Sequence, residues 1–513
     1  MHSSSPSEPV GSTASSSRGR GRHLLFALIG AVALVAAACG GGSEGGSSSG
    51  GSSGGSGGDL PECPVDAVED ADGVTEVTLW HAWVGLTKRT VESIAEDYNS
   101  SQDKVKVNVE AQGNYEEMLA KYESALADPE SLPDMVLSED TTTQFMIDSQ
   151  TVVPAQSCID ADPDAKEFYD QVLPAVTAGW TVEDALWPAA FSVSQPVLYV
   201  NENHLSAAGV DTATLPATLD ELRAAAEKIK AAGLEGVEKP LVLRLDAWYL
   251  EHLLTGSKQP IVNEANGRSG LATESELAND ATTDVYEWFR SMYDDGLLNA
   301  IPYSQPYDQL FAMALGSSSM LIDTSTAITS VNSAIEGTLK NEDIGAEDLG
   351  IDLSTFKFDS LKIGVGLNPG FTEAGQGQIG GAGWYMVDRG NDAGIAASWD
   401  FLKFFNETPN QVRWTLEGSY LPVSEAARND PALQKDFSES RRGQWLAIAS
   451  SSLDELDPEF PGPVFGPYNQ FRAAVRSSFE KITLGQEDVA ATIESVDAGF
   501  QDDLTTYAEE VGG

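Results

Sequence analysis

Residues 104–138 read KVKVNVEAQGNYEEMLAKYESALADPESLPDMVLS and contain two strand patterns with a helix pattern between them. The three valines of residues 105–109 alternate with polar residues, which predicts a half-buried strand. Asn114 is followed three residues later by Glu117, a capping-box arrangement that begins a helix. The apolar run of residues 133–138 predicts a buried strand. This strand–helix–strand order favours a mainly parallel sheet covered by helices.

The same alternation continues on both sides of this stretch. Residues 74–83 begin as an alternating strand and end in aromatic residues, and residues 90–101 place their apolar side chains on one helical face. Later strand patterns are PVLYVN, SMLIDT, KIGVGL and GWYMV, and later helix patterns are TLDELRAAAEKIKAAG, DVYEWFRSMYDDG and AASWDFLKFFNE. No long linker interrupts the roughly 440 residues that follow residue 72, which is enough for more than one compact unit. We therefore expect an α/β fold of two lobes joined directly.

The N-terminal 38 residues have the pattern of a secretory signal peptide. Three arginines between residues 18 and 22 precede an apolar run, residues 24–38, that is too short to span a bilayer comfortably. Small residues then lead to Cys39. This junction resembles a bacterial lipoprotein box, in which the cysteine is lipidated and becomes the mature N-terminus, although Ala36 stands where that box usually has leucine. The alternative is ordinary secretion with an incidental cysteine.

A Gly/Ser-rich linker extends from Cys39 to residue 72 in this interpretation. Its residues 40–58 are almost all Gly and Ser, so they form a flexible coil with an average reach of about 25 Å. The net charge of −49 argues against a nucleic-acid partner and against a polybasic grip on lipid. No later segment has the eighteen or more apolar residues that a membrane span needs. We expect a folded body outside the cytoplasmic membrane, held there only by its lipid.

Two cysteines, Cys63 and Cys158, remain after the lipobox cysteine. In an oxidising exterior such a pair is most simply a disulfide. A catalytic thiol would need a base, and a metal site would need clustered ligands, whereas His81, His204 and His252 are scattered along the chain. We therefore expect neither a metal nor a cofactor.

Several familiar catalytic and nucleotide-binding motifs do not fit the chain. A formal GxGxxG at residues 375–380 precedes a strand instead of following one, and the chain has no P-loop, HExxH or GxSxG. Carboxylates are so abundant that a glycosidase pair remains possible from the sequence. A secreted, lipid-anchored glycoside hydrolase is therefore the alternative function.

Several stretches in order resemble the extracellular solute-binding proteins of ABC importers, of the carbohydrate type that includes maltose-binding proteins. They are VTLWHAW, ALWPAAFSVSQPVLYVNENHLSAAGV, FAMALGSSSMLIDTS, WDFLKFFNETPNQVRWTLEGSYLPVSEAA and KITLGQEDVAATIESVDAGFQ. The resemblance implies a type II periplasmic-binding-protein fold with a hinge and an interlobe cleft. It also implies a monomer that is not an enzyme, captures a small solute and hands it to a membrane permease.

The resemblance further implies how the chain divides between the lobes. Lobe I would comprise residues 73–195 and 327–380, and lobe II residues 196–326 and 381–510. Three hinge segments would cross between the lobes near residues 193–197, 323–326 and 380–383.

Within the family, LWHAWVG, AQGNYEEMLAKYESAL and SVSQPVLYVN resemble the glycerol-3-phosphate-binding branch. The ligand positions of that branch, with aromatic residues that could stack on a sugar, suggest a binding set of Trp80, Tyr115, Glu139, Ser194, Trp248, Ser325, Gly381, Trp384 and Tyr420. The branch tends to have an arginine for the phosphate where this chain has Val464 in GPVFG. That departure favours a neutral sugar, a polyol or a zwitterionic diester over glycerol 3-phosphate.

Overall fold

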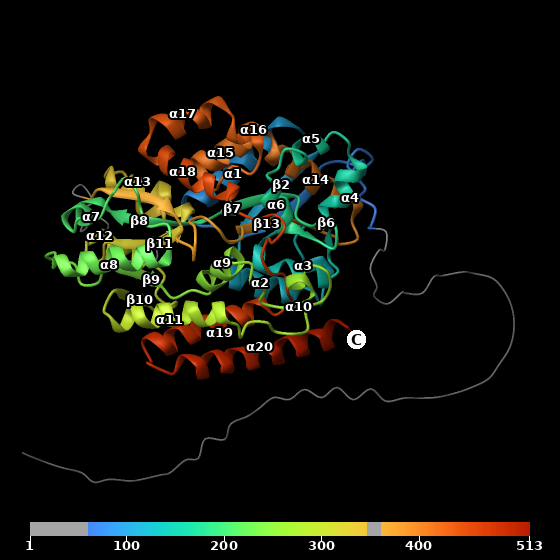
Figure 1. Cartoon of the computed structure of the whole chain (residues 1–513). Helices are drawn as coiled ribbons and strands as arrows, with labels where there is room; N and C mark the ends of the chain where they lie inside the picture. Colours follow the sequence, from blue (N-terminus) through green and yellow to red (C-terminus); the bar gives the residue numbers. More distant parts are fainter. Residues whose placement is uncertain (1–59, 346–360, 513) are drawn as a thin grey trace, which may run out of the picture. The chain divides into compact units, whose positions relative to one another are not determined.

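The computed structural model describes residues 60–345 and 361–512, and two main sheets organise this part of the chain (Figure 1). The predicted signal peptide and Cys39 lie outside the described residues. Within the described ranges, no helix combines the length and the apolar character that crossing a membrane requires.

The first sheet has the strand order β2-β1-β3-β13-β4, and β7 pairs with β13. β1 is parallel to β2 and β3, whereas β13 is antiparallel to β3, β4 and β7. The alternating valines place Val105 and Val107 in the core, as the pattern predicts, with Val107 opposite Val77 of β1. The strands are β1 (Thr75–His81), β2 (Val105–Ala111), β3 (Met135–Glu139), β4 (Val152–Val153), β7 (Ala190–Ser194) and β13 (Gly380–Val387).

The second sheet has the order β10-β9-β11-β8-β12. β9 is parallel to β10 and β11, and β8 runs antiparallel to β11 and β12. Every residue of β8 is buried, which suits a central strand covered on both faces. Its strands are β8 (Pro196–Asn201), β9 (Leu241–Arg244), β10 (Leu298–Ile301), β11 (Met320–Thr324) and β12 (Ile363–Leu367). A separate hairpin pairs β5 (Thr181–Val182) with β6 (Ala185–Leu186).

Helices cover both sheets, and several of them begin at a residue whose side chain caps the helix. Asn114 and Glu117 form the predicted capping box at the start of α2, and Gly233 ends α8 in the left-handed conformation. Ahead of β8 come α1 (Gly85–Ser101), α2 (Tyr115–Ala125), α3 (Thr143–Asp148), α4 (Ala155–Ala161), α5 (Lys166–Tyr169) and α6 (Pro174–Trp180). Between β8 and β12 come α7 (Glu202–Ala207), α8 (Leu219–Ala232), α9 (Trp248–Gly256), α10 (Asn263–Gly267), α11 (Asp280–Asp294), α12 (Asp308–Ala314) and α13 (Ile328–Ile335).

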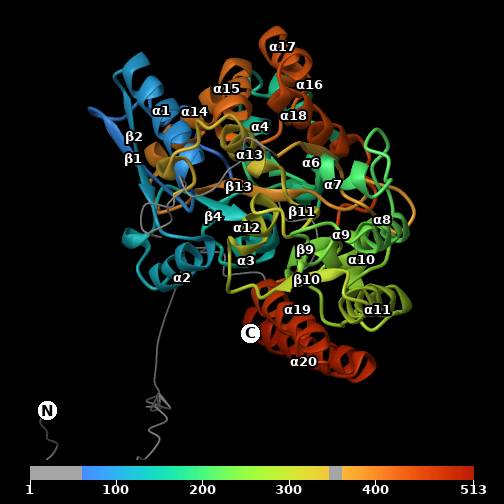
Figure 2. The same ribbon diagram turned by 90° about the vertical axis from the view of Figure 1, so that its left-hand side faces the viewer.

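The helices that follow β13 divide between the two sheets. α14 packs on β1 and α15 on α1, beside the first sheet, whereas α19 and α20 lie side by side next to α11 (Figures 1 and 2). Between these groups, α18 contacts β12 and α13. The set comprises α14 (Asp392–Asn406), α15 (Thr408–Gly418), α16 (Glu425–Arg428), α17 (Pro431–Glu439), α18 (Arg441–Ser451), α19 (Tyr468–Thr483) and α20 (Val489–Val511).

The strand pairing differs from the division of the chain expected from the sequence. β12, within the expected lobe I segment 327–380, pairs with β8 in the second sheet. β13, almost all of which falls in the expected lobe II segment 381–510, pairs with β3 in the first sheet. These two strands therefore pair in the opposite sheets from those that the expected division implies. A strand's own residues show that it is buried but do not specify which distant strand it pairs with.

The predicted disulfide between Cys63 and Cys158 is present, with Cα atoms 4.9 Å apart. Cys158 lies on α4 and is fully buried, and Cys63 is also in the core. Because Cys63 is bonded to the body, the folded region begins before residue 73, earlier than the expected end of the linker at residue 72.

Hydrogen bonds join three segments close to the predicted hinges, which we call the crossing segments: the β7–β8 connection, the residues after β11 and the residues before β13. Gln195, between β7 and β8, receives a bond at its carbonyl from the Ser325 N–H (2.8 Å) and donates its own N–H to Ser325 Oγ (3.1 Å). Its side-chain amide donates to the carbonyl of Gln378, just before β13 (3.0 Å). Gly381 follows with φ +123°, and a Cβ there would lie 2.0 Å from the Ser192 carbonyl oxygen, so this position requires glycine.

Candidate functional site

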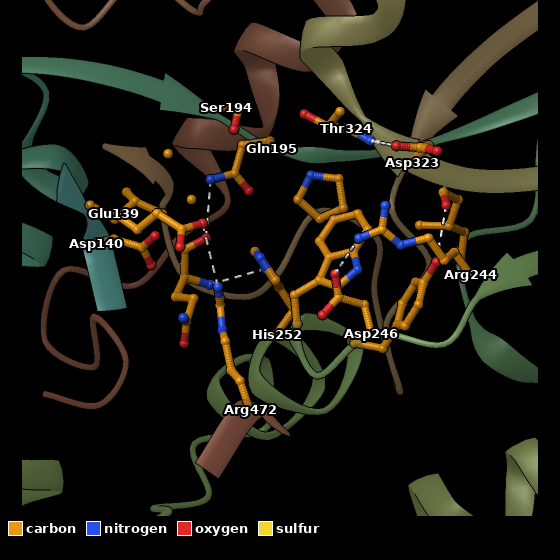
Figure 3. Close-up of a pocket in the computed structure, with 18 of the residues that line it drawn as sticks. Glu139, Asp140, Ser194, Gln195, Arg244, Asp246, His252, Asp323, Thr324 and Arg472 are labelled. Atoms are coloured by element: carbon orange, nitrogen blue, oxygen red, sulfur yellow. Dashed lines mark hydrogen bonds and ion pairs between the residues drawn. The ribbon is translucent and has the colours of Figure 1, made fainter. Parts of the chain in front are cut away.

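A cavity of about 290 Å³ lies where the crossing segments meet the carboxyl ends of β3, β9 and β11 (Figure 3). Strand ends of this kind are where open α/β sheets bind ligands. Both sheets contribute to its walls, and α19 adds side chains from a third direction. The lining includes Glu139, Asp140, Ser194, Gln195, Arg244, Asp246, Trp248, His252, Tyr303, Gln309, Asp323, Thr324, Gln378, Gly381, Arg472 and Arg476.

The cationic side chains of the cavity are held by carboxylates. Arg472 donates from Nε and Nη2 to the two oxygens of Glu251, at 2.8 and 2.7 Å. Arg476 donates from Nε to Asp246 Oδ1 at 2.8 Å. Arg244 lies 3.9 Å from the other oxygen of Asp246, and within the described part of the chain its guanidinium has no hydrogen-bond acceptor.

An aromatic ring lies against two of these arginines. The guanidinium carbon of Arg476 is 3.6 Å, and that of Arg244 is 4.1 Å, from the centroid of the Tyr303 ring. Such cation–π contacts hold planar guanidinium groups in fixed positions. Arg244 and Arg476 therefore form a preorganised cationic wall around one carboxylate, Asp246.

Burial shifts the titration of the cavity acids. It raises the pKa of the Asp140 carboxyl to about 7, although Arg472 opposes the shift. Burial likewise raises the pKa values of Glu139 and Asp323, again against a nearby arginine or hydrogen-bond donor. In the same cavity, burial lowers the pKa of His252 to about 3, so its imidazole is neutral at pH 7. A protonated carboxyl donates one hydrogen bond and can still accept others, and a neutral imidazole has one donor and one acceptor nitrogen.

Four residues of the predicted binding set line this cavity: Glu139, Ser194, Trp248 and Gly381. Glu139 ends β3 and lies on one side with Asp140, whereas Arg244, Asp246 and Asp323 lie on the other side (Figure 3). Trp248 begins α9 and is half-buried, with His252 set edge-on at 5.9 Å between ring centroids.

Three aromatic residues of the predicted binding set, Trp80, Trp384 and Tyr420, are buried and do not line the cavity. Trp384 is fully buried, packs on Phe405 at 4.4 Å between centroids and donates its indole N–H to Ser192 Oγ. Tyr420 is stacked on Trp414 and accepts a 2.8 Å hydrogen bond from Trp83. Trp80 is also buried, and its ring faces Lys121.

The other two predicted residues have different surroundings. Ser325 is completely buried and belongs to the hydrogen-bonded crossing segments. Tyr115 lines a separate, very small cavity that shares Glu139 with the larger one. Neither side chain is part of the main cavity wall.

The departure at Val464 does not leave this cavity without a cation. Val464 is buried in the core, where its N–H bonds the carbonyl of Asn266, and it does not line the cavity. Arg244, Arg472 and Arg476 supply the positive charge instead.

Several cavity residues were not predicted from the sequence. Arg244 and Asp246 could have been found from the sequence. Arg244 ends the strand pattern LVLR and Asp246 follows it, at the strand end where parallel sheets present ligand groups. The arginines of α19 carry no such signal, because that helix lies far along the chain from the strands it meets. The described His, Cys, Asp and Glu side chains form no group that could hold a metal ion.

Comparison with known proteins gives one matching family model. Residues 93–438 match the model for bacterial extracellular solute-binding proteins. The sn-glycerol-3-phosphate-binding periplasmic protein of Yersinia pseudotuberculosis is 24% identical over 435 residues, which cover 83% of this chain and 91% of the relative.

Two solved structures have the same fold. The acarbose-binding GacH receptor of Streptomyces glaucescens superimposes with a TM-score of 0.65 at 18% identity, over 85% of this chain and 99% of that one. The UgpB protein of Mycobacterium tuberculosis, solved with glycerophosphocholine, gives 0.64 at 15% identity over the same shares.

Proposed function

Because the chain belongs to the bacterial extracellular solute-binding protein family, we propose that the cavity between its two main sheets is its solute site. The chain is the substrate-binding protein of an ABC importer and serves a membrane permease. The family and its relatives bind solutes and do not transform them. The alternative of a lipid-anchored glycoside hydrolase is therefore set aside.

The solute is a small, hydroxyl-rich molecule, a sugar or a polyol. The observation that supports this class is the combination of Trp248 with acceptor carboxylates and fixed guanidinium donors in one cavity. Carboxylates accept hydrogen bonds from sugar hydroxyls, guanidinium groups donate to their oxygens, and an aromatic face packs on C–H groups. The volume of about 290 Å³ is at the lower end of ligand sites, which suits a small solute.

A glycerophosphate-type solute, such as a glycerophosphodiester, is the second candidate. The relative from Yersinia is named for sn-glycerol 3-phosphate, and the mycobacterial structure contains glycerophosphocholine. The observation that favours this class is Arg244, whose guanidinium lines the cavity without a hydrogen-bond acceptor among the described residues. A phosphate oxygen could fill that position.

The two lobes would close on the solute by bending at the three crossing segments. We assign lobe I to the first sheet and lobe II to the second, so that Glu139 and Ser194 approach the solute from one lobe and Trp248 and Arg472 from the other. A solute can drive closure only through its higher affinity for the closed form. The bonds among Gln195, Ser325 and Gln378 keep the hinges in register.

The protein would act as a monomer at the outer face of the cytoplasmic membrane. Lipidated Cys39 would anchor it after removal of the signal peptide, and the Gly/Ser-rich segment would let the body reorient toward its permease. The lipid would be its only contact with the membrane.

A thermal-shift screen of sugars, polyols and glycerophosphodiesters, followed by calorimetry of each hit, tests the proposed solute class. We expect stabilisation by at least one neutral sugar or polyol. Stabilisation by glycerophosphodiesters alone would favour the second candidate. Binding that is unchanged when Trp248 and Asp246 are both replaced by alanine would contradict the proposed site.

A further inference from the structure

Glu251 is a completely buried carboxylate immediately behind the cavity wall. It lies on α9, three residues after Trp248, and none of its surface is exposed. Both of its oxygens accept hydrogen bonds from Arg472, yet Glu251 is not part of the cavity lining. This carboxylate therefore acts on a solute only through the arginine.

Glu251 holds one edge of the Arg472 guanidinium, and the remaining nitrogen, Nη1, is available to the cavity. Glu251 binds its Nε and Nη2, whereas Nη1 lies 3.8 Å from Glu139 Oε1, which is outside hydrogen-bond distance. The side chain is 12% exposed, and that surface lies in the cavity lining. Burial disfavours the charge of Arg472, but the carboxylates around it, Glu251 foremost, together outweigh that effect and raise its pKa, so the arginine stays charged.

Because Glu251 balances the positive charge of Arg472, the pair adds little net charge to the cavity. The Nη1 of Arg472 can still donate hydrogen bonds there. Asp246 pairs with two other cavity arginines in a similar way. It is 2.8 Å from Arg476 and 3.9 Å from Arg244. Asp246 itself lines the cavity, so a solute can touch it. Glu251 does not line the cavity, so its effect on binding is indirect.

We infer that Glu251 is a specificity-determining positioning residue: by neutralising and orienting Arg472, it makes the cavity select neutral hydroxyl-bearing solutes over phosphate-like anions. The inference rests on the cavity being the solute site, as proposed above. A fully charged, unpaired arginine would attract an anion strongly in this partly dehydrated space. The paired arginine instead offers the N–H groups of its Nη1 to uncharged oxygens.

The test is the affinity for inorganic phosphate, which does not depend on knowing the natural solute. The variant Glu251→Gln keeps the shape of the side chain and removes its charge. We expect phosphate to bind this variant on the order of tenfold more tightly than it binds the wild type, as measured by calorimetry at low ionic strength. Adding Arg472→Gln should abolish the gain, because the charge released by the first change resides on that arginine.

Asp134→Asn is the matched control, because Asp134 is another buried carboxylate paired with an arginine, Arg389, and it does not line the cavity. This control should leave phosphate affinity unchanged. A merely structural role for Glu251 would lower or preserve the affinity for every ligand and could not raise it for phosphate alone. Equal phosphate affinity in folded Glu251→Gln and wild type, or an equal gain in the control, would overturn the inference. Failure of the sugar screen would instead count against the proposed function.

Discussion

The side chains of the cavity are polar and mostly paired with one another, so a bound solute must match hydrogen bonds that already have directions. Arg476 and Asp246 illustrate this, because their 2.8 Å contact holds a donor and an acceptor on the same wall. Preorganisation of this kind reduces the ordering cost of binding. Trp248 adds an apolar surface that needs no polar partner from the solute.

Replacing Trp248 by alanine should weaken binding of the solute about tenfold, because stacking on a ring contributes on the order of 1–2 kcal/mol. Calorimetry with the best ligand from the screen measures the loss. Trp288→Ala is the control, since Trp288 is also half-buried in the same lobe but lies outside the cavity. Equal losses in the two variants would mean that stacking on Trp248 is not the cause.

Replacing Asp140 by asparagine should change how stability depends on pH. The folded-state pKa of Asp140 is raised to about 7 from an ordinary 3.8, so the native protein holds a proton that the unfolded chain releases. Stability is therefore lost as pH rises from about 4 through 7. Asp140→Asn should be more stable than the wild type at pH 8 by at most about 4 kcal/mol, and solvent in the cavity reduces that figure.

Urea unfolding of the wild type and Asp140→Asn at pH 5 and pH 8 measures this difference. The advantage of the variant should grow with pH. A constant difference between the two proteins across this range would contradict the assignment.

Two helices each present a pair of side chains to the cavity, one turn apart. α9 presents Trp248 and His252 to the cavity four residues apart, with Glu251 behind them. α19 presents Arg472 and Arg476 at the same spacing, which places them on one helical face. One helix face thus supplies the aromatic surface and the other supplies the donors.

The disulfide between Cys63 and Cys158 ties the start of the folded body to α4 across 95 residues. Replacing both cysteines by serine should lower the free energy of unfolding by about 2–4 kcal/mol, chiefly because the unfolded chain gains freedom. Urea unfolding measures the loss, and solute affinity should stay the same because neither cysteine lines the cavity. Wild type unfolded with a reductant is the control. A variant as stable as the oxidised wild type would show that the bond is dispensable.

At the scale of the whole molecule, one core cluster joins the first sheet to one face of the second sheet, and another lies on the opposite face of the second sheet. The hydrogen bonds through Gln195 join the segment between β7 and β8 to the residues after β11 and before β13. In the proposed mechanism, closure over a solute bends the chain at these segments.

Cys39→Ala should release the protein into the medium, because no described helix can cross a membrane and Cys39 is the proposed lipid site. Immunoblotting of washed membranes and culture medium measures the partition. Ser43→Ala, in the same Gly/Ser-rich segment, should remain on the membrane. Retention of the cysteine variant after a salt wash would contradict the lipid anchor.

The features that the sequence determined by itself depend on near neighbours in the chain. The alternating valines of β2, the capping box of α2 and the glycine that ends α8 all follow from residues within a few positions of one another. The cysteine pair was also predictable, because only one partner was available to each. Glu139, expected from the ligand positions of the glycerol-3-phosphate-binding branch, also lines the cavity.

Tertiary structure alone decided which sheet each later strand joined and which side chains reached the cavity. β12 and β13 have similar strand patterns, yet they pair in different sheets. Trp384 and Trp248 are chemically identical, yet one is enclosed by the core and the other lines the cavity. The contact between Glu251 and Arg472 joins residues 221 positions apart. Such contacts form only when separate elements pack together, so no local pattern in the sequence specifies them.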